Sequence, residues 1–337
     1  MKIKIAINGF GRVGRTAFKI AWKRSDVEIA AINDLSDAKT LAHLLKHDST
    51  YHNYGWFQTI EAGNNSITVD GIKIPILSEK DPSRLPWKKL DVDVVVESTG
   101  FFTEYKKSKA HIKAGAKKVV ISAPCKGTGV KTILLGVNDG DLKKTDKVIS
   151  NGSCTTNCVA PLLRVLEDTI GIKKSMMTTI HSYTNSQNLQ DAPHKKLRES
   201  RAAAENIIPT STGAATSVGE AMPEELGEFN GLSIRVPTPI VSLVDLTAIT
   251  EKKITKEKLN LIFEKAIKEA RWQGILATSD EELVSSDFIG NSHSAIVDLN
   301  LTDVVAGDLI KIVAWYDNEW GYSNRLVELC VDAHNCA

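Results

Sequence analysis

A glycine-rich turn near the start of the chain constrains the fold more than any other feature of the sequence. Residues 5–14 are IAINGFGRVG, so Gly9, Gly11 and Gly14 follow an apolar run and precede an amphipathic stretch. Glycines at this spacing allow a tight strand-to-helix turn and let a pyrophosphate approach the N–H groups of the helix start. Asp34 ends a second apolar run, where its carboxylate would accept hydrogen bonds from ribose hydroxyls and repel a 2′-phosphate. The pattern predicts an NAD site rather than an NADP site; the alternative is an ordinary glycine-rich turn beside a surface aspartate.

The first half of the chain alternates short apolar runs with helix-like stretches. Strands are predicted at 2–7, 28–33, 91–99, 118–123 and 132–137. Amphipathic helices are predicted at 15–24, 39–47 and 106–118, the last with its lysines on a solvated face. Alternation of this kind is typical of a parallel α/β sheet.

The pattern changes after residue 150. A predicted helix at 159–171 is followed by strand candidates at 175–184, 232–250, 293–300 and 309–317, with a helix at 255–271 between them. A last helix, at 319–334, is expected to return to the first domain. We therefore expect an α/β Rossmann domain at 1–152, completed by a C-terminal helix at 318–337, and an α+β catalytic domain at 153–317 with a mostly antiparallel sheet.

Composition and charge exclude several classes of protein. The formal net charge is +1, which gives no global field for binding nucleic acid or an anionic membrane. No apolar run is long enough for a membrane span, and the start of the chain lacks the pattern of a signal peptide. The five cysteines are odd in number, so a reducing cytoplasm is expected rather than a disulfide framework. Cys154 and Cys158 have no second pair with which to form a metal site, so no metal is expected.

Cys154 is the candidate nucleophile because it lies in the polar segment SNGSCTTNC at the start of a predicted helix. The helix dipole and the free N–H groups there are expected to lower the pKa of the thiol. Pro161 falls inside this helix and predicts a kink or a restart. His181, at the end of a predicted strand, is the best candidate base. Of the other histidines, His194 and His293 are ambiguous, and the rest are interpreted as surface residues: His43, His47, His52, His111 and His334.

These segments resemble phosphorylating glyceraldehyde-3-phosphate dehydrogenase nearly from end to end. The resemblance rests on INGFGRVGR (7–15), ESTGFF (97–102), ISAP (121–124), SCTTNCVAP (153–161), HSYT (181–184), RAAAENIIPTSTGAA (201–215), RVPTP (235–239), VDLT (244–247) and WYDNEWGYSNR (315–325).

The resemblance implies roles for individual residues. Cys154 would attack the aldehyde, His181 would act as the base, and a thioester formed after hydride transfer to NAD would be attacked by inorganic phosphate. The implied cofactor-binding residues are Gly9, Phe10, Gly11, Arg12, Val13, Gly14, Asp34, Thr99, Phe102, Ser122, Asn318 and Tyr322. The implied substrate-binding residues are Thr184 and Arg235 for the phosphate of the substrate, and Ser153, Thr155, Thr212 and Gly213 around the attacking phosphate. Pro193 matches a proline of NAD-selective members.

The chain departs from the family pattern most clearly at Glu199, where the family has an arginine at the attacking-phosphate site. A carboxylate there is either tolerated on a flexible loop or weakens phosphate binding. Ser186, Thr216 and Cys125 are smaller departures.

Two alternative functions stay open on the sequence. One is erythrose-4-phosphate dehydrogenase, or another aldehyde-phosphate dehydrogenase with a different acyl acceptor. The other is an inactive relative that binds RNA or proteins, against which the intact Cys154, His181 and glycine turn argue. The expected partners are a phosphorylated aldehyde and inorganic phosphate, without nucleic acid or membrane. The loop at 185–206 implies a homotetramer by resemblance.

Overall fold

The structure, a computed structural model, describes residues 2–52 and 55–336. The chain forms two compact units, each described by itself below. Residues 1–133, 139–152 and 323–337 make up the first unit, and residues 134–138 and 153–322 make up the second. This division differs from the sequence-based boundary at 134–138 and at 318–322.

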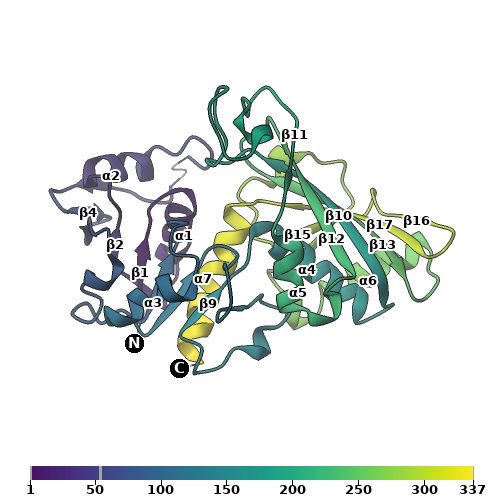
Figure 1. Cartoon of the computed structure of the whole chain (residues 1–337), viewed down its shortest axis with the longest axis horizontal. Coiled ribbons are helices and arrows are strands. Elements are labelled where there is room, and N and C mark those ends of the chain that lie inside the picture. Colours follow the sequence, from purple (N-terminus) through teal and green to yellow (C-terminus); the bar gives the residue numbers. More distant parts are fainter. Residues whose placement is uncertain (1, 53–54, 337) are drawn as a thin grey trace. The chain divides into compact units, whose positions relative to one another are not determined.

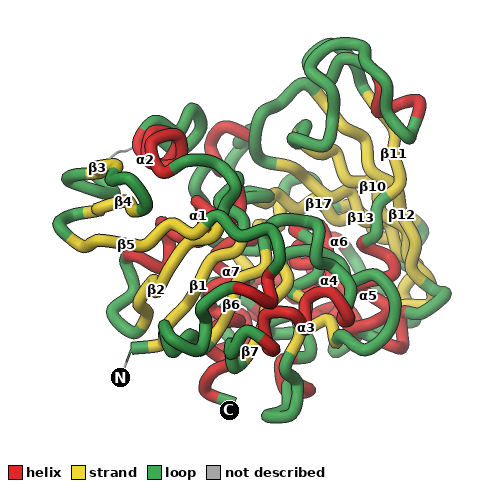
Figure 2. The backbone as a smooth tube through the Cα atoms, turned by 60° about the vertical axis from the view of Figure 1, so that its left-hand side comes forward, coloured by secondary structure: helices red, strands yellow, loops and turns green. Residues whose placement is uncertain are grey.

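The first unit is built on a sheet in which the described residues form nine strands (Figure 1). In spatial order these are β3 (Ile60–Ala62), β4 (Ser66–Val69), β5 (Ile72–Leu77), β2 (Val27–Asn33), β1 (Ile3–Asn8), β6 (Val94–Glu97), β7 (Lys118–Ile121), β9 (Val148–Ser150) and β8 (Lys131–Thr132). From β5 to β8 every pairing is parallel, whereas β3, β4 and β5 pair antiparallel. The chain passes from β2 on one side of β1 to β6 on the other, so the carboxyl ends of these strands form a topological switch point. Figure 2 shows β2, β1 and β6 side by side.

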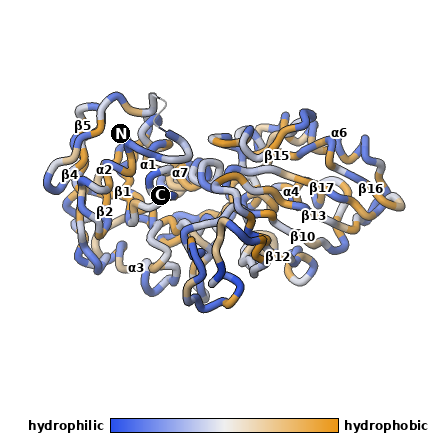
Figure 3. The backbone as a smooth tube through the Cα atoms, turned by 90° about the horizontal axis from the view of Figure 1, so that it is seen from above, coloured by the Kyte–Doolittle hydropathy of each residue, from blue (hydrophilic) through white to orange (hydrophobic). Residues whose placement is uncertain are grey.

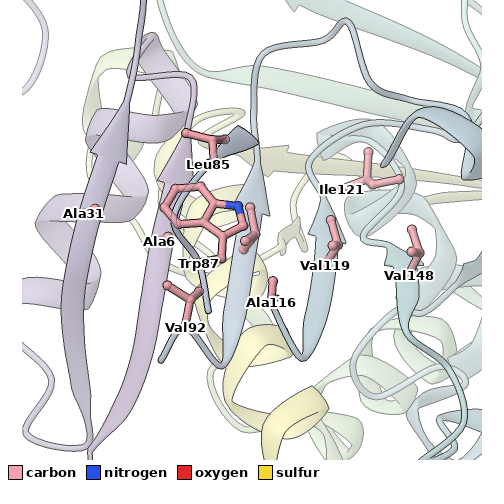
Figure 4. Packing of buried hydrophobic residues seen from close by; sticks show 10 residues of the cluster. Ala6, Ala31, Leu85, Trp87, Val92, Ala116, Val119, Ile121 and Val148 are labelled. Carbon is pink, nitrogen blue, oxygen red and sulfur yellow. The ribbon is translucent and has the colours of Figure 1, made fainter. Parts of the chain in front are cut away.

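Helices α1 (Arg12–Trp22), α2 (Ala38–Lys46) and α3 (Tyr105–Lys113), with most of α7 (Trp320–Asn335), belong to the first unit. On one part of the sheet, buried side chains gather around Trp87 (Figure 4). The indole packs with Leu85 and Val92 beside small residues of the strands, such as Ala6 and Ala31, which leave room for the ring. Truncation of a buried ring of this size typically costs about 3–5 kcal/mol, so this cluster is a main source of stability for the unit.

The second unit contains an eight-stranded sheet among its described residues. Its main path runs through β11 (Ile208–Ser211), β12 (Phe229–Val236), β10 (Ile172–Ser182), β13 (Ser242–Thr250), β17 (Leu309–Tyr316), β15 (Ala295–Asp298) and β14 (Leu276–Ser279), and β16 (Asp303–Val305) pairs with β17. The β10–β12 and β14–β15 pairings are parallel and the others antiparallel. The helices of this unit are α4 (Cys154–Glu167), α5 (Ala214–Ala221) and α6 (Lys256–Ala266).

Hydrophobic residues follow the strands of both sheets (Figure 3). In β13 the side chains alternate between buried and half-buried along the whole strand, as expected for a sheet with only one face against a core. The first sheet has a different burial pattern. Its strands β1 and β6 are buried almost throughout, as in a parallel sheet covered on both faces. The predicted fold class, a Rossmann α/β part followed by an α+β part with a mostly antiparallel sheet, is confirmed.

Three local predictions were wrong. Of the predicted strand at 132–137 only Thr132 is extended, as the second residue of β8, because Leu134 starts a turn closed by the bond from Val137 N to its carbonyl. The predicted strand at 232–250 is two strands, since Pro237 and Pro239 cannot donate to a sheet ladder. Helix α4 runs through Pro161 without a restart. Eleven of its fourteen residues are buried, so packing outweighs the hydrogen bond that the proline removes.

His111 was predicted to be a surface residue, and this was also wrong. The lysines of α3 are exposed as expected, but the imidazole of His111 is fully buried. It lies between the indole of Trp87 and the carboxylate of Glu97, and both ring nitrogens have partners. A single polar residue on the inner face of an amphipathic helix looks like a surface residue until its buried partners are known.

A cluster of carboxyl groups lies at the end of α4 in the second unit. Glu225 is buried, with only 3% of its surface exposed. Burial, followed by the charge of Glu167, raises the pKa of Glu225 to about 7. Burial also raises the pKa of Glu167, whereas Glu224 pairs with Arg164. The native state therefore favours the protonated form of Glu225.

The pH dependence of stability follows from this raised pKa. A carboxyl with a higher pKa in the folded state stabilises the fold below its unfolded pKa of about 4.3, and that contribution is lost as the pH rises through the folded pKa. We expect Glu225→Gln to unfold like wild type at pH 5 but to be more stable at pH 8, by up to about 3 kcal/mol. Thermal unfolding at the two pH values measures the difference. The exposed Glu228→Gln is the control, and equal melting temperatures at pH 8 would contradict the prediction.

Candidate active site

The glycine-rich turn joins β1 to α1 in the first unit. Gly9 has φ +94°, a left-handed conformation, and a Cβ there would lie 2.8 Å from the backbone nitrogen of Thr99. A Cβ on Gly14 would lie 2.1 Å from the carbonyl oxygen of Gly9, so helix and turn touch backbone to backbone. A Cβ on Gly11 would meet nothing within 4 Å. Two of the glycines are therefore required by packing, and the third keeps a space open.

A pocket of about 420 Å³ opens beside this turn at the carboxyl ends of β1, β2 and β6. Its lining residues are Asn8, Gly9, Gly11, Asn33, Asp34, Leu35, Glu79, Lys80, Ser98, Thr99, Phe101 and Phe102. Asp34 accepts a hydrogen bond from Phe10 N (2.8 Å) through one carboxylate oxygen and from Ser36 N (2.9 Å) through the other. The open space at Gly11, the uncapped start of α1 and the acid at the end of β2 fit an adenine dinucleotide.

The structure brings together only part of the predicted cofactor set. Gly9, Gly11, Asp34, Thr99 and Phe102 line the pocket, while Phe10 and Gly14 support the turn from behind. Arg12 and Val13 are half-buried at the start of α1. Ser122 does not line the pocket, and its N–H donates to the carbonyl of Glu97. Asn318 and Tyr322 belong to the second unit.

Several lining residues were missed by sequence reasoning. Asn8 and Asn33 each end an apolar strand with a polar side chain, which is a usable signal for a residue at the carboxyl edge of a parallel sheet. Glu79 and Lys80 lie in an irregular segment that no pattern distinguishes.

An ion-pair network holds the start of α1. Asp48 binds Arg12 Nη1 and the buried Lys19 Nζ, each at 2.9 Å. Burial by itself would raise the pKa of Asp48, but the hydrogen bond from Lys19 and the charge of Arg12 outweigh it and hold that pKa well below its usual range. Burial also lowers the pKa of Lys19. The network fixes the direction of the Arg12 side chain.

Cys154 is the first residue of α4 in the second unit. Ser153 caps the helix: its hydroxyl accepts from Thr156 N (3.0 Å), and Thr156 Oγ1 accepts from Ser153 N (3.3 Å). The hydroxyl of Thr155 is turned inward onto Tyr316 OH (3.0 Å). The capping box therefore fixes the backbone around Cys154.

His181 ends β10 close to this thiol. Its Nε2 lies 3.4 Å from Cys154 Sγ, across 27 positions of sequence. Its Nδ1 lies 2.8 Å from the carbonyl oxygen of Ser182. The carbonyl can only accept and favours a proton on Nδ1, which would turn the Nε2 lone pair to the sulfur, whereas Arg235 Nη1, which contacts the same nitrogen, can only donate and favours the other tautomer. Burial, followed by the charge of Arg235, lowers the pKa of His181 to about 3, so the imidazole is neutral at pH 7.

The N–H groups at the helix start lower the pKa of Cys154 as predicted, but burial outweighs them and the net shift is upward. Removal from water raises the pKa of this thiol, and the nearby charge of Arg235 opposes that rise only in part. The resting pair is therefore a neutral thiol beside a neutral imidazole. The thiol can lose its proton to a base within hydrogen-bond distance, and His181 Nε2 lies at that distance.

Two further side chains support this pair. Tyr316 had no predicted role, and Asn318 was predicted only as a cofactor-binding residue. Tyr316, on β17, bonds Thr155 Oγ1 and Thr179 Oγ1 and packs edge-on against the imidazole of His181. Asn318 accepts hydrogen bonds from Ser182 Oγ (3.0 Å) and Ser242 Oγ (3.1 Å), which fixes the orientation of its amide. The aromatic segment around 315–322 was the available signal for Tyr316.

The predicted substrate residues lie on several elements of the second unit. Arg235 pairs in register with His181 across β12 and β10; its Nη1 contacts His181 Nδ1 and donates to Ser182 O (3.0 Å). Thr184 Oγ1 lies 2.9 Å from Ser186 Oγ. Thr212 Oγ1 accepts from Ala214 N, and Gly213 is the N-cap of α5. Arg235 thus contacts the Cys154–His181 pair directly.

Glu199 is buried rather than projecting from a flexible loop. Its Oε1 accepts from Thr210 Oγ1 and from Lys196 Nζ, the latter at 2.9 Å. The same ammonium group contacts Thr210 Oγ1 (3.3 Å) and Ser211 Oγ (3.1 Å). Burial alone would raise the pKa of Glu199, but the hydrogen bonds from Thr210 and Lys196 hold it below its usual value. The carboxylate is thus ionised and paired with a lysine.

The five cysteines are free thiols. Within the described part of the chain, no three His, Cys, Asp or Glu side chains gather as a metal-binding group. The described helices include none that combines the length and apolar character needed to cross a bilayer.

The two kinds of glycine in the turn predict different outcomes for the same substitution. Gly14→Ala should destabilise the fold by at least about 2 kcal/mol, because its Cβ would overlap the Gly9 carbonyl. Gly11→Ala should cost at most about 1 kcal/mol but weaken NAD binding, because its methyl group would project into the pocket. Urea unfolding and calorimetric NAD titration separate the two effects. Equal loss of stability in both variants would contradict this distinction.

The chain is similar to known proteins over nearly its whole length. Residues 3–105 match the family described as glyceraldehyde 3-phosphate dehydrogenase, NAD binding domain, and residues 153–318 match its C-terminal domain. Glyceraldehyde-3-phosphate dehydrogenase of Borreliella burgdorferi is 52% identical over 97% of this chain and 98% of that protein. The Geobacillus stearothermophilus protein of the same name is 50% identical over 98% of this chain and 97% of its own length. The chain belongs to the glyceraldehyde-3-phosphate dehydrogenase family.

Proposed function

We propose that this protein oxidises D-glyceraldehyde 3-phosphate with NAD and inorganic phosphate to give 1,3-bisphosphoglycerate. The observation that carries the proposal is the contact of Cys154 Sγ with His181 Nε2 at 3.4 Å, beside the cation of Arg235. The names of the relatives favour this substrate over erythrose 4-phosphate.

The reaction begins with transfer of the thiol proton from Cys154 to His181. The thiolate adds to the aldehyde carbon, so that a C–S bond forms and the carbonyl oxygen becomes an oxyanion. The N–H of Cys154, at the start of α4, and the protonated His181 are placed to stabilise that oxyanion, which takes the proton back to give a thiohemiacetal. His181, neutral again, then removes the hydroxyl proton.

When bound, NAD supplies the acceptor for the hydride that leaves the same carbon. The product on Cys154 is a thioester, which keeps the free energy of the oxidation. A phosphate oxygen attacks the acyl carbon, the C–S bond breaks, and Cys154 leaves as a thiolate that can take back the proton of His181. The low water exposure of His181 suits a site where hydrolysis must be slower than phosphate attack.

The binding roles are proposed on the family pattern. The turn residues Gly9 to Gly14 would hold the pyrophosphate, Asp34 the adenosine ribose, Thr99, Phe102 and Ser122 the adenine side, and Asn318 and Tyr322 the nicotinamide side. The NAD-binding domain would be 1–152 with 318–337, and the catalytic domain 153–317. Thr184 and Arg235 would bind the phosphate of the substrate, and Ser153, Thr155, Thr212 and Gly213 the attacking phosphate. Thr155 would act through its backbone, since its hydroxyl binds Tyr316.

We also propose that the protein is a cytoplasmic homotetramer. Support for self-association comes from the second unit, where large apolar side chains of the sheet are exposed, among them Met176, Leu232 and Leu309. Met176 and Leu309 line a groove of about 360 Å³ on this sheet. Light scattering in solution is the direct measurement of the assembly.

The proposed reaction is tested by NADH absorbance. With glyceraldehyde 3-phosphate and NAD, NADH should accumulate steadily only when phosphate or arsenate is present. Cys154→Ser should abolish the activity. His181→Gln should lower kcat by about 100-fold or more and slow the reaction of Cys154 with iodoacetamide, because the base is gone. His194→Gln, at a half-buried loop histidine outside the Cys154–His181 pair, should change neither rate. Steady NADH formation without phosphate would contradict the phosphorylating reaction.

Glu199 is expected to influence how this protein uses inorganic phosphate. Its ionised carboxylate should repel phosphate, while the paired Lys196 limits the effect. Glu199→Gln keeps an acceptor for Thr210 and removes the charge. We expect the apparent KM for phosphate to fall about two- to fivefold, in keeping with a screened pair. Glu205→Gln, on the same loop and exposed, is the control. An unchanged KM would mean that Glu199 has no influence on phosphate use.

A further inference from the structure

The buried carboxylate of Glu97 lies at the carboxyl end of β6, behind the dinucleotide pocket rather than in its lining. Four donors converge on its two oxygens. Thr99 N (2.9 Å) and Thr99 Oγ1 bind Oε1, and Asn8 Nδ2 (2.5 Å) and His111 Nε2 (3.0 Å) bind Oε2. Only 1% of the surface of Glu97 is exposed, so these bonds replace its hydration.

The first pair of bonds holds one wall of the pocket. Thr99 donates its hydroxyl proton to Glu97, and its Oγ1 accepts from Phe101 N at 3.1 Å. Thr99, Phe101 and their neighbours Ser98 and Phe102 line the pocket. The conformation of residues 98–102 is thus tied to one oxygen of Glu97.

The second pair of bonds holds another part of the lining, which forms a second wall of the pocket. Asn8, bound to Glu97 through its amide nitrogen, accepts from Asn33 Nδ2 through its oxygen at 2.7 Å. Asn33 in turn makes two hydrogen bonds with the backbone of Glu79. Its Oδ1 accepts from Glu79 N and its Nδ2 donates to Glu79 O, each at 2.9 Å. Glu79 and Lys80 line the pocket, so this wall is tied to the other oxygen of Glu97.

The network is anchored in the core by His111 and Trp87. Trp87 Nε1 can only donate, and it donates to His111 Nδ1 at 2.9 Å. His111 Nε2 therefore carries a proton and points it at Glu97. Trp87 is part of the buried cluster of Figure 4, which cannot shift without opening a cavity. Because the groups around Glu97 offer donors, two carboxylate oxygens, which accept, satisfy all of them at once.

We propose that Glu97 is a positioning residue of the dinucleotide pocket, which holds its two walls at the separation that the adenosine part of NAD requires. The inference rests on the proposed NAD site and adds a residue that does not itself touch the ligand. A glutamine at 97 offers one oxygen and one NH₂ group. The NH₂ would face the N–H donors of either Thr99 or Asn8 and His111, so one wall is released whichever way the amide turns.

The test is calorimetric titration of the purified full-length protein with ADP-ribose, which carries the adenosine part without nicotinamide. Glu97→Gln should weaken ADP-ribose binding about tenfold or more, because a buried donor is left unsatisfied. The rate of Cys154 alkylation by iodoacetamide should stay at the wild-type value. Glu104→Gln is the matched control, since Glu104 is partly exposed in the same unit and pairs with Lys107.

Thr99→Val gives a second route if Glu97→Gln does not fold, since it keeps the shape of the side chain and removes only the hydroxyl. It should weaken ADP-ribose binding by releasing the 98–102 wall. In the double variant the two losses should not add, because both break the same bonds. Unchanged affinity in a folded Glu97→Gln variant, or fully additive losses, would overturn the inference.

The outcomes separate this inference from the proposed function. If wild type binds neither NAD nor ADP-ribose, the proposed cofactor is wrong. If wild type binds both and Glu97→Gln binds them equally well, the NAD site stands and only the role of Glu97 is rejected.

Discussion

The first unit depends on one constraint: polar side chains buried at the carboxyl edge of a parallel sheet must find partners there. Asn8, Asn33 and Glu97 end β1, β2 and β6 and satisfy one another across up to 89 positions of sequence. A change in strand register would leave these groups unpaired in a low-dielectric interior, at a cost of about 1–3 kcal/mol each. The same bonds that fix the register also shape the pocket, so stability and cofactor binding share their residues.

In the second unit, the constraint is the protonation state of the Cys154 thiol in the absence of substrate. The half-buried Cys154 has a raised pKa and the buried His181 a lowered one, so neither is charged at rest. Their contact provides the path by which charge separates when the aldehyde is in place. Arg235, which bonds the same carbonyl as His181, brings a fixed positive charge beside the pair. We infer that reactivity here comes from the pair and not from the helix start alone.

Much of this was predictable from local patterns. The glycine spacing and the acid at Asp34 located the pocket, because turn sterics and strand ends are short-range properties. Cys154 and His181 were predicted from their local segments and from the resemblance, and the structure brings them into contact. The burial of His111 and the direction of the net pKa shift of Cys154 were not predictable. Both depend on which groups surround the side chain and how much water reaches it. Glu199 shows the same limit: its partner Thr210 comes from another element of the fold.

The sequence by itself determined the alternation of strands and helices in the first half of the chain, the glycine turn and the family to which the chain belongs. These follow from backbone sterics, hydrophobic periodicity and motifs that are contiguous in the chain. Only the tertiary structure decided that α4 continues through Pro161 and that Asp48 fixes the direction of the Arg12 side chain. It also decided that Glu97 bonds residues on both walls of the pocket. Packing, desolvation and hydrogen-bond satisfaction act between residues far apart in sequence, and no local pattern encodes them.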